Sequence, residues 1–370
     1  DRQPVPGEQA QVVLIDLEAA SERVVAHTRG WEPQMGANIN WGDTDEALYF
    51  NDVDPSDWSA FCVKLNPLTG TSERLGGTIY RISPDGRHVI SACMKRMRRT
   101  QCGYGVMVPD EHVERNFGLR DDDGLYITDT ATGKSRLLVS IGEVFRCARP
   151  AIDIRKYEKG ECYGFHCKYN PQGDRIIFTM RWYATQDPQP WNMIGKHLDF
   201  WVVTMKPDGS DIHVAVGPEQ WEKGGHHNNW QPDGRSLSMN LAIDGDRKMY
   251  FVRVHEDGTG LAKISRTLRG SGHPTIHVGG RYILTDAYAG EPVSFGDGTV
   301  PIRWIDLESQ TEQCIARVNV VNPAMKRDNS MRVDPHPAWA YDNRHIAFNG
   351  FVGGARRVFV ADLGPLLGMA

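Results

Sequence analysis

Short apolar strands alternate along most of the chain with turns rich in Pro, Asp and Gly. Pro presets φ, and Gly or Asn accepts a positive φ, so these turns predict tight hairpins between the strands. A further strand that ends in Asp recurs after several of the hairpins, for example at residues 12–16, 125–129 and 302–306. The turns lie at residues 83–86, 170–173, 231–234, 278–280 and 341–343, with a degenerate version at 43–45.

Three to four short strands that recur about every 40–60 residues are typical of the blades of a β-propeller. We therefore expect an all-β chain that forms a single propeller domain over residues 1–370. The pattern contains six complete inner hairpins, and the strand at residues 12–16 precedes the first of them. This order predicts seven blades with an incomplete first blade. The alternative is a six-bladed ring whose N-terminal strand closes the last blade.

Two long insertions interrupt the repeat, at residues 94–123 and 183–198. Long segments on a rigid scaffold are common places for substrate contacts. We therefore expect both insertions to line the functional site.

One position of the repeat, seven residues before the turn Gly or its equivalent, holds histidine in four units. In chain order this position is Asn38, Ile79, His166, His227, His273 and His336. Inner strands line the axis of a propeller, so the four histidines are predicted to converge. Asp334 lies two residues before His336 and should face the same side of its strand. Imidazole and carboxylate together suit a divalent metal or acid–base chemistry. Alternatively, each histidine is structural and binds a neighbouring backbone group.

Net charge and cysteine content limit the partners and the cellular location that we expect for this protein. The net charge of −5 and the pI of about 6.2 argue against nucleic acid and anionic membranes, which attract basic surfaces. No apolar run approaches the ~20 residues of a membrane-spanning helix. Seven cysteines without paired zinc-type spacing favour a reducing, cytoplasmic location. A Cys162–Cys167 bridge would instead indicate a periplasmic or secreted protein, and the oligomeric state stays open.

Several side chains are candidates for binding an acidic substrate. Arginine recognises carboxylates through its two-pronged guanidinium group, and Arg99, Arg181 and Arg332 lie in or near the predicted site. Tyr104, in the first insertion, is a further candidate for substrate contact. For any single arginine the alternative is a solvated surface position.

Residues 227–234 (HNNWQPDG) and 334–339 (DPHPAW) resemble the metal-binding blades of the oligogalacturonate lyases. Residues 164–166 and 271–273 resemble two further segments of that family. The resemblance implies a seven-bladed propeller that cleaves uronate oligosaccharides by β-elimination with a metal, usually manganese. By position it makes His227 and His336 metal ligands and His166 the base. Propeller lyases for ulvan and rhamnosyl-glucuronate are similar in outline.

This sequence departs from the family at two metal-binding positions. Asp334 stands where the family has histidine, and Met331 where it has glutamine. A carboxylate can bind a metal, so Ca²⁺ and Mg²⁺ join Mn²⁺ as candidate cofactors.

Together these features predict a lyase that degrades a uronate-containing polysaccharide. His166 is the predicted base, and Arg181 or Arg99 the partner of the substrate carboxylate. His227, Asp334 and His336 are the predicted metal ligands, with His273 as a fourth candidate. Two other functions stay open: a sugar- or protein-binding propeller without catalysis, and a glycoside hydrolase. The hydrolase would need paired carboxylates.

Overall fold

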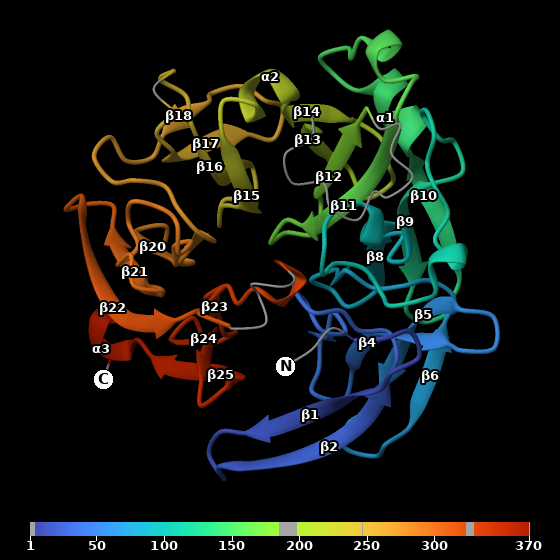
Figure 1. Ribbon diagram of the computed structural model, residues 1–370, viewed down its shortest axis with the longest axis horizontal. Helices are drawn as coiled ribbons and strands as arrows, with labels where there is room; N and C mark the ends of the chain where they lie inside the picture. Colours follow the sequence, from blue (N-terminus) through green and yellow to red (C-terminus); the bar gives the residue numbers. More distant parts are fainter. Residues whose placement is uncertain (1–3, 185–197, 246, 323–328, 370) are drawn as a thin grey trace. The chain divides into compact units, whose positions relative to one another are not determined.

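The computed structural model describes residues 4–184, 198–245, 247–322 and 329–369. The chain is almost entirely β and divides into two compact units, an N-terminal unit (residues 3–214) and a C-terminal unit (residues 215–370). Each unit contributes three blade-like antiparallel sheets, most of whose strands are labelled in Figure 1. The predicted all-β propeller class is confirmed, with six blades.

The blades of the N-terminal unit are four-stranded antiparallel sheets. Their first strands lie side by side, because β7 contacts both β3 and β11. The second strand of the third blade, β12, is buried at seven of its eight positions, since both of its faces pack against neighbouring elements. The strands are β3 (Asn40–Trp41), β4 (Leu48–Asp54), β5 (Ser59–Leu65), β6 (Ser72–Leu75), β7 (Arg81–Ile82), β8 (His88–Ala92), β9 (Gly124–Asp129), β10 (Ser135–Ser140), β11 (Glu161–Tyr169), β12 (Ile176–Tyr183), β13 (Leu198–Met205) and β14 (His213–Val216).

The C-terminal unit contains two four-stranded blades and one three-stranded blade. In its first blade, strand β16 is fully buried although it alternates Ser and Asn with apolar residues. The strands are β15 (Gly225–Trp230), β16 (Ser236–Leu241), β17 (Tyr250–His255), β18 (Ala262–Lys263), β19 (Thr275–Ile276), β20 (Tyr282–Thr285), β21 (Thr299–Asp306), β22 (Thr311–Asn319), β23 (Ala338–Trp339), β24 (His345–Val352) and β25 (Ala355–Asp362).

The prediction of a seventh, incomplete blade is wrong. The N-terminal strands β1 (Ala10–Asp16) and β2 (Ser21–Thr28) form a sheet of their own with only two strands. Most of β2 is exposed or half-buried. A third strand or an inner hairpin, which a blade would need, does not pair with them in the part of the chain that the structure describes.

The helices are short and lie between or after the strands of the repeat in the sequence. No helix among the described residues is long and apolar enough to cross a membrane. The helices are α1 (Ile141–Cys147), α2 (Pro218–Trp221) and α3 (Gly364–Leu367), with 3-10 turns η1 (Arg96–Arg99), η2 (Asp110–His112), η3 (Ile154–Lys156) and η5 (Asn329–Met331).

The first insertion packs into the core of the N-terminal unit. Met97, Val106, Val108 and Val113 are almost completely buried there. Most of the second predicted insertion, residues 185–197, lies outside the described residues. All seven cysteines are free, including Cys162 and Cys167, and burial raises the pKa of both of those thiols.

Candidate metal centre

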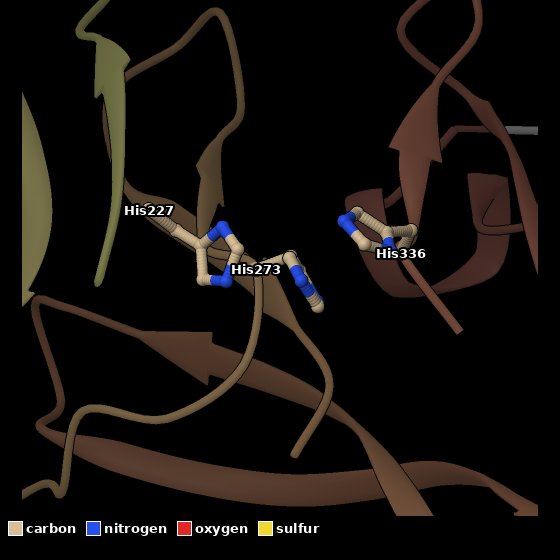
Figure 2. Close-up of side chains that lie close together, drawn as sticks. All are labelled: His227, His273 and His336. Atoms are coloured by element: carbon tan, nitrogen blue, oxygen red, sulfur yellow. The ribbon is translucent and has the colours of Figure 1, made fainter. Parts of the chain in front are cut away.

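Three of the four histidines in register meet in the C-terminal unit. His227 belongs to β15, while His273 and His336 lie in the segments that lead into β19 and β23. One ring nitrogen from each lies within 4.8 Å of the other two. Figure 2 shows the three side chains facing one another from these separate segments. The ring centroids of His273 and His336 are 3.2 Å apart, and those of His227 and His273 are 3.9 Å apart.

An unusual backbone conformation directs two of these imidazoles. The φ angles of His227 and His336 are +57° and +46°, in the left-handed region that residues with a Cβ rarely adopt. His227 also lies in a β-bulge between His226 and Asn229. Asn38, at the same repeat position in the first blade, has φ +51°. Such strain costs about 1–3 kcal/mol and typically persists at functional sites. Three of the six residues at this repeat position therefore share a left-handed backbone geometry.

A buried carboxylate, Asp286, holds two of the histidines. Its Oδ1 accepts hydrogen bonds from the main-chain N of His273 at 2.7 Å and lies 2.9 Å from the His273 Nδ1. Its Oδ2 accepts from the main-chain N of His336 at 2.9 Å. Asp286 is 1% exposed. Burial raises the pKa of this carboxyl, while His336 and the N–H donors oppose that rise. With Nδ1 of His273 occupied by Asp286, its Nε2 is left to face a metal.

The absence of a side chain at Gly272 permits this arrangement. Gly272 has φ +63°, and a Cβ there would overlap both the carboxylate and the main-chain carbonyl of Asp286. The glycine before His273 thus lets the backbone of one segment approach the next closely.

Tyr288 completes the surroundings of the histidines. Its hydroxyl makes a short hydrogen bond with Nε2 of His227 and lies 3.2 Å from Nε2 of His273. The sequence analysis identified neither Asp286 nor Tyr288. The available signal was their position: both follow the second inner strand of the His273 blade, two residues apart, which places them on one side of an extended chain.

Asp334 lies outside the three-histidine cluster. Its Oδ2 accepts a hydrogen bond from Nε of Arg332 at 2.9 Å, and both side chains are mostly buried. Burial, with the charge of Arg332, lowers the pKa of the nearby Arg356. Met331, at the family's glutamine position, is a buried apolar residue at 4% exposure. In this structure Asp334 is thus part of a charged cluster with two arginines, and its predicted role as a metal ligand stays a prediction.

Two further histidines have structural partners. His226, beside His227, pairs with Asn240 at 3.1 Å and with Glu291 at 3.5 Å. His277 lies 3.1 Å from the carbonyl oxygen of Asn343.

The fourth histidine in register, His166, belongs to the N-terminal unit. It lies in a β-bulge of β11 between Gly164 and Cys167. Its ring stacks on Phe165, with centroids 3.7 Å apart, and lies 5.5 Å from the ring of Tyr80. The predicted substrate contact Tyr104 is buried, and its ring centroid is 6.0 Å from that of His166.

Arg181 and Arg99, the two arginines predicted to bind the substrate carboxylate, have different surroundings. The guanidinium of Arg181 lies 3.7 Å from the Phe165 ring centroid and donates to Oε1 of Gln101 at 2.8 Å. Arg181 and His166 therefore both contact the ring of Phe165. Arg99 is 7% exposed, and its guanidinium donates to the carbonyl oxygen of Val113. That hydrogen bond joins two parts of the first insertion, residues 94–123.

The donor set in the C-terminal unit fits a borderline transition metal. Imidazole suits Fe, Ni, Cu or Zn, whereas Mg²⁺, Ca²⁺ and Mn²⁺ prefer oxygen ligands, so the case for Mn²⁺ rests on the family resemblance and not on the three histidines. The outer carboxylate of Asp286 fixes one imidazole as metal-binding histidines usually require. The three imidazoles leave further coordination positions for a substrate.

Comparison with known proteins supports the fold alone. No protein-family model and no curated protein matches the chain. The structure is similar to that of an oligogalacturonate lyase in complex with manganese, with TM-score 0.59 and 15% identity over 95% of this chain and 82% of that one. It is also similar to a puromycin-hydrolysing peptidase of Mycobacterium tuberculosis, with TM-score 0.50 and 14% identity over 92% of this chain and 48% of that one. An oligogalacturonate lyase of Vibrio parahaemolyticus matches with TM-score 0.45 and 12% identity over 97% and 98% of the two chains.

Proposed function

We propose that this protein is a metal-dependent lyase that cleaves uronate-containing oligosaccharides by β-elimination. The observation that carries the proposal is the cluster of His227, His273 and His336, whose ring nitrogens lie within 4.8 Å of one another. The substrate class comes from the motif resemblance to oligogalacturonate lyases around His227 and His336. Acidic oligosaccharide is thus the proposed partner.

In β-elimination a base removes the C5 proton of a uronate and the glycosidic oxygen at C4 leaves. That proton is weakly acidic while the neighbouring carboxylate keeps its full charge. A divalent ion, Mn²⁺ in the first instance, bound by the three histidines would neutralise the carboxylate and stabilise the developing negative charge.

The protein's own residues would prepare this site. Asp286 fixes the tautomer of His273 through Nδ1, so that Nε2 keeps a lone pair. It also binds the main-chain N of His336, so one carboxylate orients two candidate ligands. His166 as the base and Arg181 as the carboxylate partner remain proposals, each open to test by its own variant.

The decisive experiment uses the full chain, stripped of metal and then supplied with Mn²⁺. Oligomers of galacturonate, of glucuronate and of ulvan are incubated with it, and the new C4–C5 double bond is followed by ultraviolet absorbance. Mass spectrometry separates elimination from hydrolysis, because hydrolysis adds water to the products. His227→Ala should abolish the signal. His345→Ala, an exposed histidine paired with Asp342, should retain it.

Three outcomes would contradict the proposal. If no substrate yields an unsaturated product, the protein would instead be a binding module without catalysis. Hydrolytic products would indicate a glycoside hydrolase, and equal activity without metal would remove the role of the histidine cluster.

A further inference from the structure

The phenol of Tyr288 occupies a place beside the metal-facing atoms of two histidines. Its oxygen makes a short contact with Nε2 of His227 and lies 3.2 Å from Nε2 of His273. The Tyr288 ring meets the His273 ring edge-on, at 69° with centroids 5.4 Å apart. The hydroxyl therefore points at the nitrogens, and the ring does not stack over them.

For His273, the nitrogen beside the Tyr288 hydroxyl is the one that a metal would use. Nδ1 of His273 faces Asp286 at 2.9 Å, so Nε2 is the ring nitrogen of His273 that a metal would use. With metal–ligand bonds of ~2.1 Å, neighbouring ligand atoms are ~3.0–3.4 Å apart, from octahedral to tetrahedral geometry, and an octahedral ion keeps positions for a substrate. The 3.2 Å separation of the Tyr288 oxygen and the His273 nitrogen is close to that spacing. The Tyr288 oxygen and Nε2 of His273 thus have the separation expected of two atoms bound to the same metal.

Local structure fixes Tyr288 in this position. Its carbonyl oxygen accepts a hydrogen bond from the main-chain N of Glu291 at 3.0 Å, which closes a turn. Asp286, two residues earlier, is held by His273 and His336. The segment that carries the tyrosine is therefore held by two site histidines before Tyr288 and by a local turn after it.

A phenol also supplies what the three imidazoles lack. Neutral histidines leave a divalent ion with its full charge, and an anionic oxygen ligand would reduce it. Tyrosine serves as an iron ligand in catalase, so the chemistry has precedent. We propose that Tyr288 is the fourth protein ligand of this metal centre, together with His227, His273 and His336. On ligation the O–H bond is replaced by an oxygen–metal bond, and the proton passes to solvent. The inference rests on the proposed function only in that a metal binds here.

Two probes test this inference on the metal-free full chain. Cu²⁺ reports a bound phenolate through a visible charge-transfer band and tyrosinate ring modes in resonance Raman spectra. Mn²⁺ affinity is measured by titration calorimetry. We expect both Cu²⁺ signals in the native protein and their loss in Tyr288→Phe, with Mn²⁺ bound more than ~10-fold more weakly, since even outer partners contribute that much.

Tyr282→Phe is the matched control. Tyr282 lies on β20 of the same blade, and its ring stacks on Trp304 with centroids 4.4 Å apart. This variant should keep the Cu²⁺ signals and the Mn²⁺ affinity. The native protein alone suffices for the spectroscopic test, so a poorly folded Tyr288→Phe variant would not leave the inference undecided.

The failures of the two proposals look different. Stoichiometric Cu²⁺ without tyrosinate modes, or unchanged Mn²⁺ affinity in Tyr288→Phe, overturns the ligand assignment and leaves the lyase proposal standing. Tyrosinate modes without any unsaturated product support the ligand and overturn the lyase. A native protein that binds neither ion overturns both.

Discussion

Asp286→Asn is the substitution that most directly tests how the metal centre is built. The carboxylate receives the main-chain N–H groups of His273 and His336 on separate oxygens and also contacts Nδ1 of His273. Asparagine keeps the shape but has a single oxygen. Whichever way its amide turns, one of the two buried N–H groups then faces an NH2 donor.

The expected size of the effect follows from these contacts. A hydrogen bond to a charged group contributes ~1.5–3 kcal/mol, and removal of a buried charge offsets part of its loss. We therefore expect the metal-free Asp286→Asn protein to lose ~1–2 kcal/mol of unfolding free energy. Loss of the carboxylate that orients a ligand histidine weakens metal binding by ~10–100-fold. Tenfold corresponds to ~1.4 kcal/mol, so Mn²⁺ binding should weaken by ~1.4–2.7 kcal/mol.

Calorimetric titration with Mn²⁺ and urea denaturation of the metal-free protein measure the two effects. Asp334→Asn is the matched control, because Asp334 lies two residues before His336 but its carboxylate pairs with Arg332. Mn²⁺ affinity within about threefold of native in Asp286→Asn would refute the orienting role, since outer partners normally exceed that. A larger loss in Asp334→Asn than in Asp286→Asn would restore Asp334 as a direct ligand.

Three further substitutions test other parts of the chain. Burial, with the charge of Arg81, lowers the pKa of Lys168 to about 7 from 10.5. The unfolded chain then binds more protons between these values, so stability should rise with pH across that window. Lys168→Met should flatten this slope in urea denaturation and stabilise the protein at neutral pH, whereas exposed Lys206→Met should do neither. Gly272→Ala should destabilise the protein by more than ~1 kcal/mol and weaken Mn²⁺ binding, because the new Cβ would overlap Asp286. Gly280→Ala is the control: open space surrounds its Cβ, so it should cost only the strain of its positive φ and leave the Mn²⁺ affinity unchanged. His166→Gln should lower the elimination rate by ~100-fold or more while Mn²⁺ affinity holds, and an unchanged rate would exclude His166 as the base.

The sequence by itself determined the repeat and the positions of its histidines. Period-two strands separated by Pro-, Gly- and Asn-containing turns specify local hairpins, and all six inner hairpins are present in the structure. Because hairpin register is set locally, the shared position of His227, His273 and His336 could be read before any fold was known. The register alone did not decide which of them meet, because His166 shares it and lies outside the cluster of three.

Only the tertiary structure decided what surrounds the histidines. Asp286 and Tyr288 reach His227, His273 and His336 across separate segments, and spacing along the chain carries no record of such contacts. The orientation of Asp334 toward Arg332 was likewise invisible, because period two gives the side of a strand and not the partner found there. The blade count was mispredicted for a related reason. An isolated N-terminal pair of strands has the same alternating pattern as the outer half of a blade, and only pairing with a third strand distinguishes them.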